Sequence, residues 1–210
     1  MRLFDYDTNI YDFRKLVSGY LDIENLNQLH KMYSLDLLNE NTDQSTIVHR
    51  KFYDGMDSDN RFIKLYDTFI NDNVSLLHND EILYQTYPTF RVHVPNNICV
   101  FKWHKDKEFN HNPKEINYFL PLTDSFGNNS IWLESEEDLG DFTPIKSYYG
   151  QLIEFNGANC RHGNKINDTE ITRVSFDFRI LKLKDYKNTE LSSKSKNTKF
   201  VIGEYYKNAK

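Results

Sequence analysis

The feature that most limits the fold of this chain is a change of sequence texture near residue 82. From there on, short runs rich in Val, Ile, Phe, Tyr and Thr alternate with clusters of Pro, Gly and Asn, without a helical pattern between them. The runs predict strands at "TFRVHV" (89–94), "NICVFKWHKD" (97–106), "EINYFLPL" (115–122), "SIWLES" (130–135), "IKSYYG" (145–150), "QLIEFNG" (151–157) and "TRVSFDFRIL" (172–181). Consecutive short strands of this kind are typical of a β-sandwich or a barrel.

The first 80 residues predict helices instead. Residues 61–78 carry apolar side chains at helical spacing in one stripe, namely Phe62, Leu65, Tyr66, Phe69 and Ile70. Asp57 or Ser58 would cap the start of this helix. Residues 26–38 show a weaker helical pattern, with Leu26, Leu29, Tyr33 and Leu37. Near the other end, the polar residues 187–199 predict a flexible loop, and residues 200–206 predict a last strand.

The bulk properties exclude several classes of protein. A chain of 210 residues suits a single domain and can bury a core without disulfides. The net charge of −5 argues against a nucleic-acid binder, and no apolar run approaches the length of a membrane span. The N-terminus lacks the apolar stretch of a signal peptide, and two cysteines do not make a disulfide framework. We therefore expect a cytoplasmic protein whose partner is a small molecule; nothing in the sequence requires or excludes a homodimer.

A His-x-Asp triplet ends the strand predicted over 97–106. Chance alone would give roughly 0.6 such triplets in a chain of this composition, and the chain has two. His78 and Asp80 fall at the end of the predicted helix and are interpreted as structural. His104 and Asp106 would point to the same side of a strand, because side chains two residues apart share a face. Both side chains could then reach one ion.

A third ligand and an anion site follow further along the chain. His162 lies beside a glycine, between two predicted strands, and is either a surface histidine or a group that points into a barrel mouth. Two histidines and one carboxylate would form a facial triad with three open positions. Arg173 and Ser175 share a strand face 11 to 13 residues later. Their donors suit a carboxylate, whereas the alternative for Arg173 is a salt bridge, for example with Asp177.

These residues resemble a known family. The order His-x-Asp, distal His and Arg-x-Ser is similar to that of iron(II)- and 2-oxoglutarate-dependent oxygenases. The segments "TFRVHVPNNICVFKWHKDKEFNHNPKEINYFLPLTDSFGNNSIWLESE" and "YYGQLIEFNGANCRHGNKINDTEITRVSFDFRI" resemble the oxygenases of streptomycin-type and sporadic carbohydrate gene clusters, which are relatives of phytanoyl-CoA hydroxylase. The resemblance covers roughly residues 85 to 182, and the first 80 residues carry no matching motif.

The resemblance implies a fold and a chemistry. It implies a double-stranded β-helix (jelly-roll, cupin-like) core over 82–183 with helices of residues 1–81 packed outside, followed by a polar loop and strand over 184–210, all in one domain. It implies Fe(II) on His104, Asp106 and His162 as the catalytic centre, with 2-oxoglutarate on the metal and its far carboxylate on Arg173 and Ser175. O2 would take the remaining position, and succinate and CO2 would be released.

Strand phase proposes residues for the co-substrate and the substrate. Asn117, as a buried amide, could hold 2-oxoglutarate or the substrate. The candidates for reading the substrate are side chains expected on cavity-facing sides of strands, namely Arg91, His93, Lys102, Trp132 and Glu134. Lys102 and Trp132 have bland alternatives, a lysine at the barrel rim and a core tryptophan.

Three functions remain open from the sequence. The leading hypothesis is a dioxygenase that hydroxylates or oxidises a sugar, an aminosugar or a nucleotide-linked sugar. The second keeps the chemistry and changes the substrate to a free amino acid or amine. The third is a non-oxidative cupin-like protein, either a metal-dependent isomerase or a sugar-binding protein, because His-Asp-His would also bind Zn²⁺.

Overall fold

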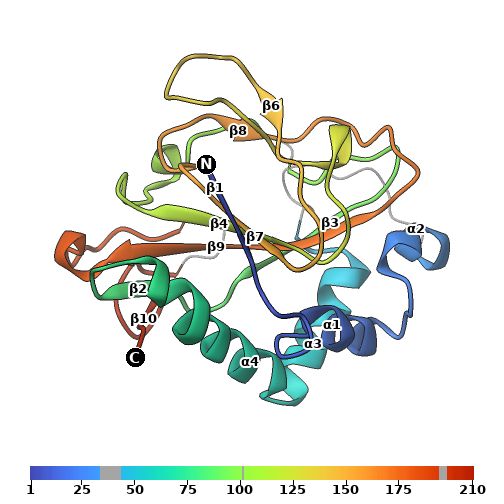
Figure 1. Ribbon diagram of the computed structural model, residues 1–210, viewed down its shortest axis with the longest axis horizontal. Helices are drawn as coiled ribbons and strands as arrows, with labels where there is room; N and C mark the ends of the chain where they lie inside the picture. Colours follow the sequence, from blue (N-terminus) through green and yellow to red (C-terminus); the bar gives the residue numbers. More distant parts are fainter. Residues whose placement is uncertain (34–43, 101, 194–197) are drawn as a thin grey trace.

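The structure is a computed structural model that describes residues 1–33, 44–100, 102–193 and 198–210 (Figure 1). Its strands are β1 (Arg2–Asp5), β2 (Ile82–Gln85), β3 (Thr89–His93), β4 (Ile116–Pro121), β5 (Trp132–Leu133), β6 (Thr143–Pro144), β7 (Gln151–Phe155), β8 (His162–Gly163), β9 (Arg173–Lys182) and β10 (Tyr206–Asn208). Its α-helices are α1 (Phe13–Leu21), α2 (Leu29–Met32), α3 (Ile47–Ser58) and α4 (Arg61–Phe69). Short helical turns are η1 (Leu26–Gln28), η2 (Ile70–Val74), η3 (Ser75–Leu77), η4 (Asp106–Phe109), η5 (Gly127–Asn129) and η6 (Leu183–Asp185).

The strands form two antiparallel sheets. The larger sheet has the order β1-β7-β4-β9-β2-β10, and β3 also pairs with β9; the smaller sheet has the order β6-β5-β8. In Figure 1 the long strand β9 runs through the middle, the smaller sheet lies above it and helices α1, α3 and α4 lie below. The expectation of a mainly β protein with helices outside is confirmed, although the sheets do not close into a barrel within the part of the chain that the structure describes.

The two faces of β9 pack against different surroundings. Val174, Phe176, Phe178 and Ile180 belong to the large hydrophobic core, together with apolar residues of α1, α3 and α4. The alternate residues Arg173, Ser175, Asp177 and Arg179 point the other way, because side chains alternate along a strand. A second apolar cluster, with Phe119, Ile131 and Phe155 among its members, lies on that other side. The polar face of β9 is therefore enclosed between the two sheets.

Helix α4 confirms the predicted apolar stripe and corrects its start. Phe62, Tyr66 and Phe69 are buried, and Leu65 is partly buried against the same core. Neither Asp57 nor Ser58 caps the helix, because both lie inside α3. Asp59 instead accepts a hydrogen bond from the backbone N–H of Arg61 at 2.9 Å. The weaker pattern over 26–38 forms η1 and α2, and Leu37 lies outside the described residues.

Several strand predictions are wrong. The described residues of 97–106 form an irregular segment whose single bridge joins His104 to His162. Residues 145–150 form no strand, and the chain pairs just before them, in β6. The last strand begins at Tyr206, because residues 200–205 form bends, an isolated bridge at Ile202 and a turn. Strand β1 pairs with β7 although it lies in the part expected to be helical.

The expectations about cysteines, membrane spans and the polar loop can be compared with the described residues. Both cysteines are buried, and neither is in a disulfide within the described residues. Within the residues described, no helix has the length and apolar character needed to cross a membrane. Part of the predicted loop 187–199, residues 194–197, lies outside the described residues.

Candidate active site

Three of the sequence-predicted ligands lie together. His104 forms a bridge with His162 of β8, in which each backbone N–H donates to the other's carbonyl at 3.0 Å. Asp106 begins η4, and its backbone N–H donates to Gly157 at 3.0 Å. The ligand atoms of His104, Asp106 and His162 lie within 4.8 Å of one another. The geometry that unites them is a loop anchored to β8, and not the strand alternation expected from the sequence.

The hydrogen bonds of the two imidazoles leave one ring nitrogen of each available as a metal ligand. Nδ1 of His104 lies 2.8 Å from the carbonyl of Lys102, and Nδ1 of His162 lies 3.1 Å from the carbonyl of Cys160. Since a carbonyl only accepts, each Nδ1 carries the hydrogen, and each Nε2 presents a lone pair. These Nε2 atoms lie 3.2 and 3.6 Å from Oδ1 of Asp106. Three acceptors that converge in this way can hold a metal ion between them.

Burial argues that this cation is a metal and not a proton. Desolvation lowers the pKa of His162 to about 4, so its ring is neutral at physiological pH. For Asp106, burial alone would raise the pKa, but Arg179, His104 and His162 together hold it well below its usual range. The centre therefore combines the neutral imidazole of His162 and an ionised carboxylate with the Nε2 atom of His104, and two imidazoles with one carboxylate are the donor set of a facial triad.

Asp106 is itself held by two neighbours. Oδ2 accepts from Nε of Arg179 and from Nδ2 of Asn117, each at 2.7 Å. Asn117 was expected to contact 2-oxoglutarate or substrate; it does line the pocket, and its hydrogen bond to Asp106 orients the carboxylate. Its Oδ1 is buried and has no hydrogen-bond partner among the described residues.

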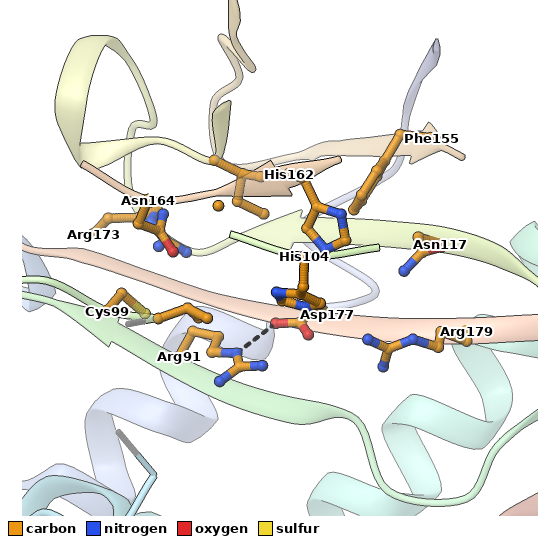
Figure 2. A pocket seen from close by; sticks show the side chains of 13 residues that line it. Arg91, Cys99, His104, Asn117, Phe155, His162, Asn164, Arg173, Asp177 and Arg179 are labelled. Carbon is orange, nitrogen blue, oxygen red and sulfur yellow. Dashed lines mark hydrogen bonds and ion pairs between the residues drawn. The ribbon is translucent and has the colours of Figure 1, made fainter. Parts of the chain in front are cut away.

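A pocket opens beside the triad. The empty space in and in front of it, open solvent included, is about 440 Å³. Figure 2 shows Arg173 at one end, Asn117 and Arg179 at the other, and His104 and His162 between them. Apolar lining comes from Cys99, Val100, Ile131 and Phe155.

Arg173 is a buried cation whose side chain donates to neutral groups. Its side chain is 1% exposed, its Nε donates to the carbonyl of Asn129 at 2.7 Å, and Nη1 donates to Ser175 at 2.6 Å. Burial lowers its pKa. No carboxylate lies within ion-pair distance of it among the described residues, since Asp177 pairs with Arg91 at 3.1 Å. The alternative of an Arg173–Asp177 salt bridge is therefore wrong, and Ser175 supports Arg173 from behind without lining the pocket.

The substrate residues predicted on β3 and on the segment 97–106 lie in different surroundings. Arg91 lines the pocket and is held by Asp177. The prediction for His93 is wrong, because its ring is fully buried with both nitrogens at backbone carbonyls, those of Asn129 and Asn97. The prediction for Lys102 is wrong as well: its side chain is exposed and outside the pocket lining, and its carbonyl orients His104.

Strand β5 has the opposite phase to the one expected. Ile131 lines the pocket, whereas Trp132 lies outside it with Nζ of Lys165 at 3.3 Å from the ring centre. Glu134 is buried and accepts from the backbone N–H groups of Arg161 and Gly140. Neither Trp132 nor Glu134 therefore lines this pocket, and the side chain of Ile131 faces it instead.

Sequence reasoning missed Arg179, Asp177, Cys99 and Asn164 as lining residues. A signal for two of them existed. Arg179 lies six residues after Arg173 on the same strand, and Asp177 lies four after it, so alternation places both on the face assigned to Arg173. Cys99 and Asn164 lie on irregular segments, for which no periodicity predicts direction.

Comparisons with known proteins agree with this fold. No protein-family model matches the chain. The streptomycin biosynthesis protein StrG of Streptomyces griseus is 39% identical over 196 residues, which are 93% of this chain and 90% of the relative. The non-heme monooxygenase ThoJ shares the fold, with TM-scores of 0.51 for its nickel complex and 0.52 for its apo form, at 12% and 11% identity; each match covers 85% of this chain and 71% of ThoJ. With nearly the whole of both chains aligned, this protein belongs to the family of the streptomycin biosynthesis protein StrG.

Proposed function

We propose that this protein is an Fe(II)- and 2-oxoglutarate-dependent oxygenase with a double-stranded β-helix core, acting on a small polar metabolite. One observation carries the proposal: the pocket lined by His104 and His162 is also lined by the buried guanidinium of Arg173, which has no carboxylate within ion-pair distance among the described residues. A dicarboxylate co-substrate provides the anion that Arg173 lacks. The likeness to ThoJ, a non-heme monooxygenase described with nickel, supports the fold of such an enzyme.

The residues present fit the metal and the co-substrate. His104, Asp106 and His162 would hold the metal as a facial triad, which would leave room for other ligands. When bound, iron(II) with 2-oxoglutarate and O2 supplies the power to oxidise a C–H bond, with release of succinate and CO2. Arg173, held by Ser175 and Asn129, binds the far carboxylate and so fixes the position of the co-substrate. Ile131 and Phe155 limit the access of water to the site.

The groups left over favour a substrate rich in hydrogen-bonding groups. With the triad on the metal, Arg173 on the co-substrate and Arg179 and Asn117 on Asp106, the polar lining that remains is Arg91, Asp177 and Asn164. A carboxylate beside a guanidinium offers an acceptor and donors next to each other, a combination that suits hydroxyl groups. We therefore place a sugar, an aminosugar or a nucleotide-linked sugar first among substrates, and the name of StrG, a streptomycin biosynthesis protein, supports that choice.

The proposal is tested by anaerobic titration of Fe(II) and 2-oxoglutarate into the apoprotein. We expect a weak visible charge-transfer band that His104→Ala abolishes. His78→Ala is the matched control, because it alters the other His-x-Asp triplet, whose histidine bonds to Tyr118 away from the pocket, and should keep the band. Iron binding without the band would refute the oxygenase and favour a metal-dependent isomerase or a sugar-binding protein. With the band in hand, succinate release across a panel of sugars, aminosugars, nucleotide-linked sugars and amino acids tests the substrate class.

A further inference from the structure

The two oxygens of Asp106 have different surroundings. Oδ1 faces Nε2 of His104 at 3.2 Å and Nε2 of His162 at 3.6 Å. Oδ2 accepts two hydrogen bonds of 2.7 Å, from Arg179 and from Asn117. A carboxylate oxygen has two lone-pair sites, so both sites of Oδ2 are occupied. Only Oδ1 is left for the metal.

The two donors are built to stay where they are. Asn117 and Arg179 are directly opposite each other on the paired strands β4 and β9. Arg179 is 8% exposed; its Nη1 lies 3.4 Å from Oε1 of Gln85, which also accepts from Tyr205, and its Nε lies 3.8 Å from Glu115.

The amide of Asn117 is fixed as tightly. The backbone of Gly157 packs on it, since a Cβ at that position would lie 2.8 Å from Cγ of the amide. A flipped amide would direct its oxygen at the carboxylate and lose the hydrogen bond. Asn117 therefore keeps its donor on Oδ2.

A carboxylate that bound the metal through both oxygens would occupy one more position. A facial triad leaves three positions open, of which 2-oxoglutarate uses two and O2 one. A second oxygen from Asp106 would therefore compete with the co-substrate or with O2.

We propose that Arg179 and Asn117 are positioning residues that hold Asp106 as a one-oxygen ligand and thereby keep three coordination positions open. This inference rests on the proposed function. It adds a role for two residues that act through Asp106, since their hydrogen bonds go to its Oδ2. Arg179 supplies the charge that compensates Asp106, and Asn117 supplies the second donor that directs Oδ2 away from the metal.

The test uses Mn(II) as the probe in the full-length apoprotein, under conditions without turnover. Water-proton relaxation reports the number of waters on bound Mn(II), and calorimetry gives the dissociation constant of 2-oxoglutarate for the Mn(II)-loaded protein. In Arg179→Met, one water is replaced by Oδ2, so the relaxation enhancement per bound Mn(II) should fall by about a third, from three waters to two. The dissociation constant of 2-oxoglutarate should rise roughly tenfold, and Arg179→Lys, which keeps a cationic donor, should restore both values in large part.

Two further variants make the test decisive. Arg91→Gln removes another guanidinium of the same pocket, one held by Asp177, and should leave the water count unchanged. Asn117→Ala leaves no buried charge unpaired and should lower the water count in the same direction if Arg179→Met does not fold. Relaxation and 2-oxoglutarate affinity equal to wild type in Arg179→Met and Asn117→Ala would overturn the inference. Failure of the wild-type protein to bind Mn(II) and 2-oxoglutarate would instead overturn the proposed function.

Discussion

Replacement of Arg173 by methionine should separate stability from co-substrate binding. Removal of a structural arginine from a core destabilises the protein. A buried arginine that serves to bind an anion instead lowers the stability of the protein as long as the anion is absent, so its removal costs little. Arg173 is 1% exposed and bonds only to neutral groups in the contacts above, the carbonyl of Asn129 and the hydroxyl of Ser175. Methionine fills similar space without a charge. The two interpretations therefore predict changes of different size in the free energy of unfolding.

The magnitudes follow from these contacts. Loss of two hydrogen bonds from a charged group costs roughly 3–6 kcal/mol, and removal of a buried cation returns several kcal/mol of desolvation. The free energy of unfolding of the metal-free, ligand-free protein should therefore change by no more than about 1–2 kcal/mol, in either direction. A carboxylate that loses both charge-assisted bonds to Arg173 loses at least about 3 kcal/mol, which weakens 2-oxoglutarate binding roughly 100-fold or more.

Urea unfolding of the apoprotein and calorimetric titration of 2-oxoglutarate into Mn(II)-loaded protein measure the two quantities. Arg91→Met is the matched control, because its guanidinium has a carboxylate partner, with side chains 14% and 13% exposed. It leaves Asp177 unpaired and should destabilise the protein by about 1–3 kcal/mol, with 2-oxoglutarate affinity kept within about threefold. If Arg173→Met loses 4 kcal/mol or more while its 2-oxoglutarate affinity stays near wild type, Arg173 is a structural residue and the assigned role is wrong.

Three further predictions concern the scaffold. Burial lowers the pKa of His49 to about 4, so protonation favours the unfolded state as pH falls below about 6.5. The free energy of unfolding should therefore drop by about 2 kcal/mol from pH 7 to pH 5. Urea titrations should show that His49→Gln removes this part of the pH dependence of stability, and an unchanged pH dependence would contradict the assignment. Gly163→Ala would place a Cβ 2.7 Å from the indole of Trp103, so we expect β8 to shift and Mn(II) affinity to fall roughly tenfold; wild-type affinity would show that the indole yields freely. Phe52→Ala removes a ring stacked on Phe90 at 4.3 Å and should cost about 3–5 kcal/mol in urea unfolding, and a loss below 1 kcal/mol would mean that the core collapses onto the gap.

The sequence predicts the chemistry of the site better than its geometry. Spacing brought His104, Asp106 and His162 together correctly, yet the reason given, two side chains on one strand face, does not hold. The segment is irregular, and a backbone bridge to β8 and the first turn of η4 aim the side chains. Residue type and order restrict which groups can share a metal, whereas the path of a loop depends on distant partners that no local pattern records.

Strand phase succeeded where a strand is long and failed where it is short. On the ten residues of β9, the alternation of apolar and polar side chains placed Arg173 correctly, and the same rule extends to Arg179. On the two residues of β5 the rule had too little length to fix the phase, and Trp132 was assigned to the cavity in place of Ile131. A strand of two residues takes its orientation from the neighbouring strands, which for β5 are β6 and β8.

The order in which this chain is synthesised bears on when it can acquire its metal. The ligands lie at residues 104 to 162, but Arg179, which holds Asp106, comes later, and Tyr205, which bonds to the Gln85 side chain beside Arg179, later still. A nascent chain that already displays both histidines still lacks the strand that fixes the carboxylate. Selective metal loading should therefore follow translation past Tyr205, and a chain stalled before that point would present the same ligands without the constraint that sets how many of its oxygens bind.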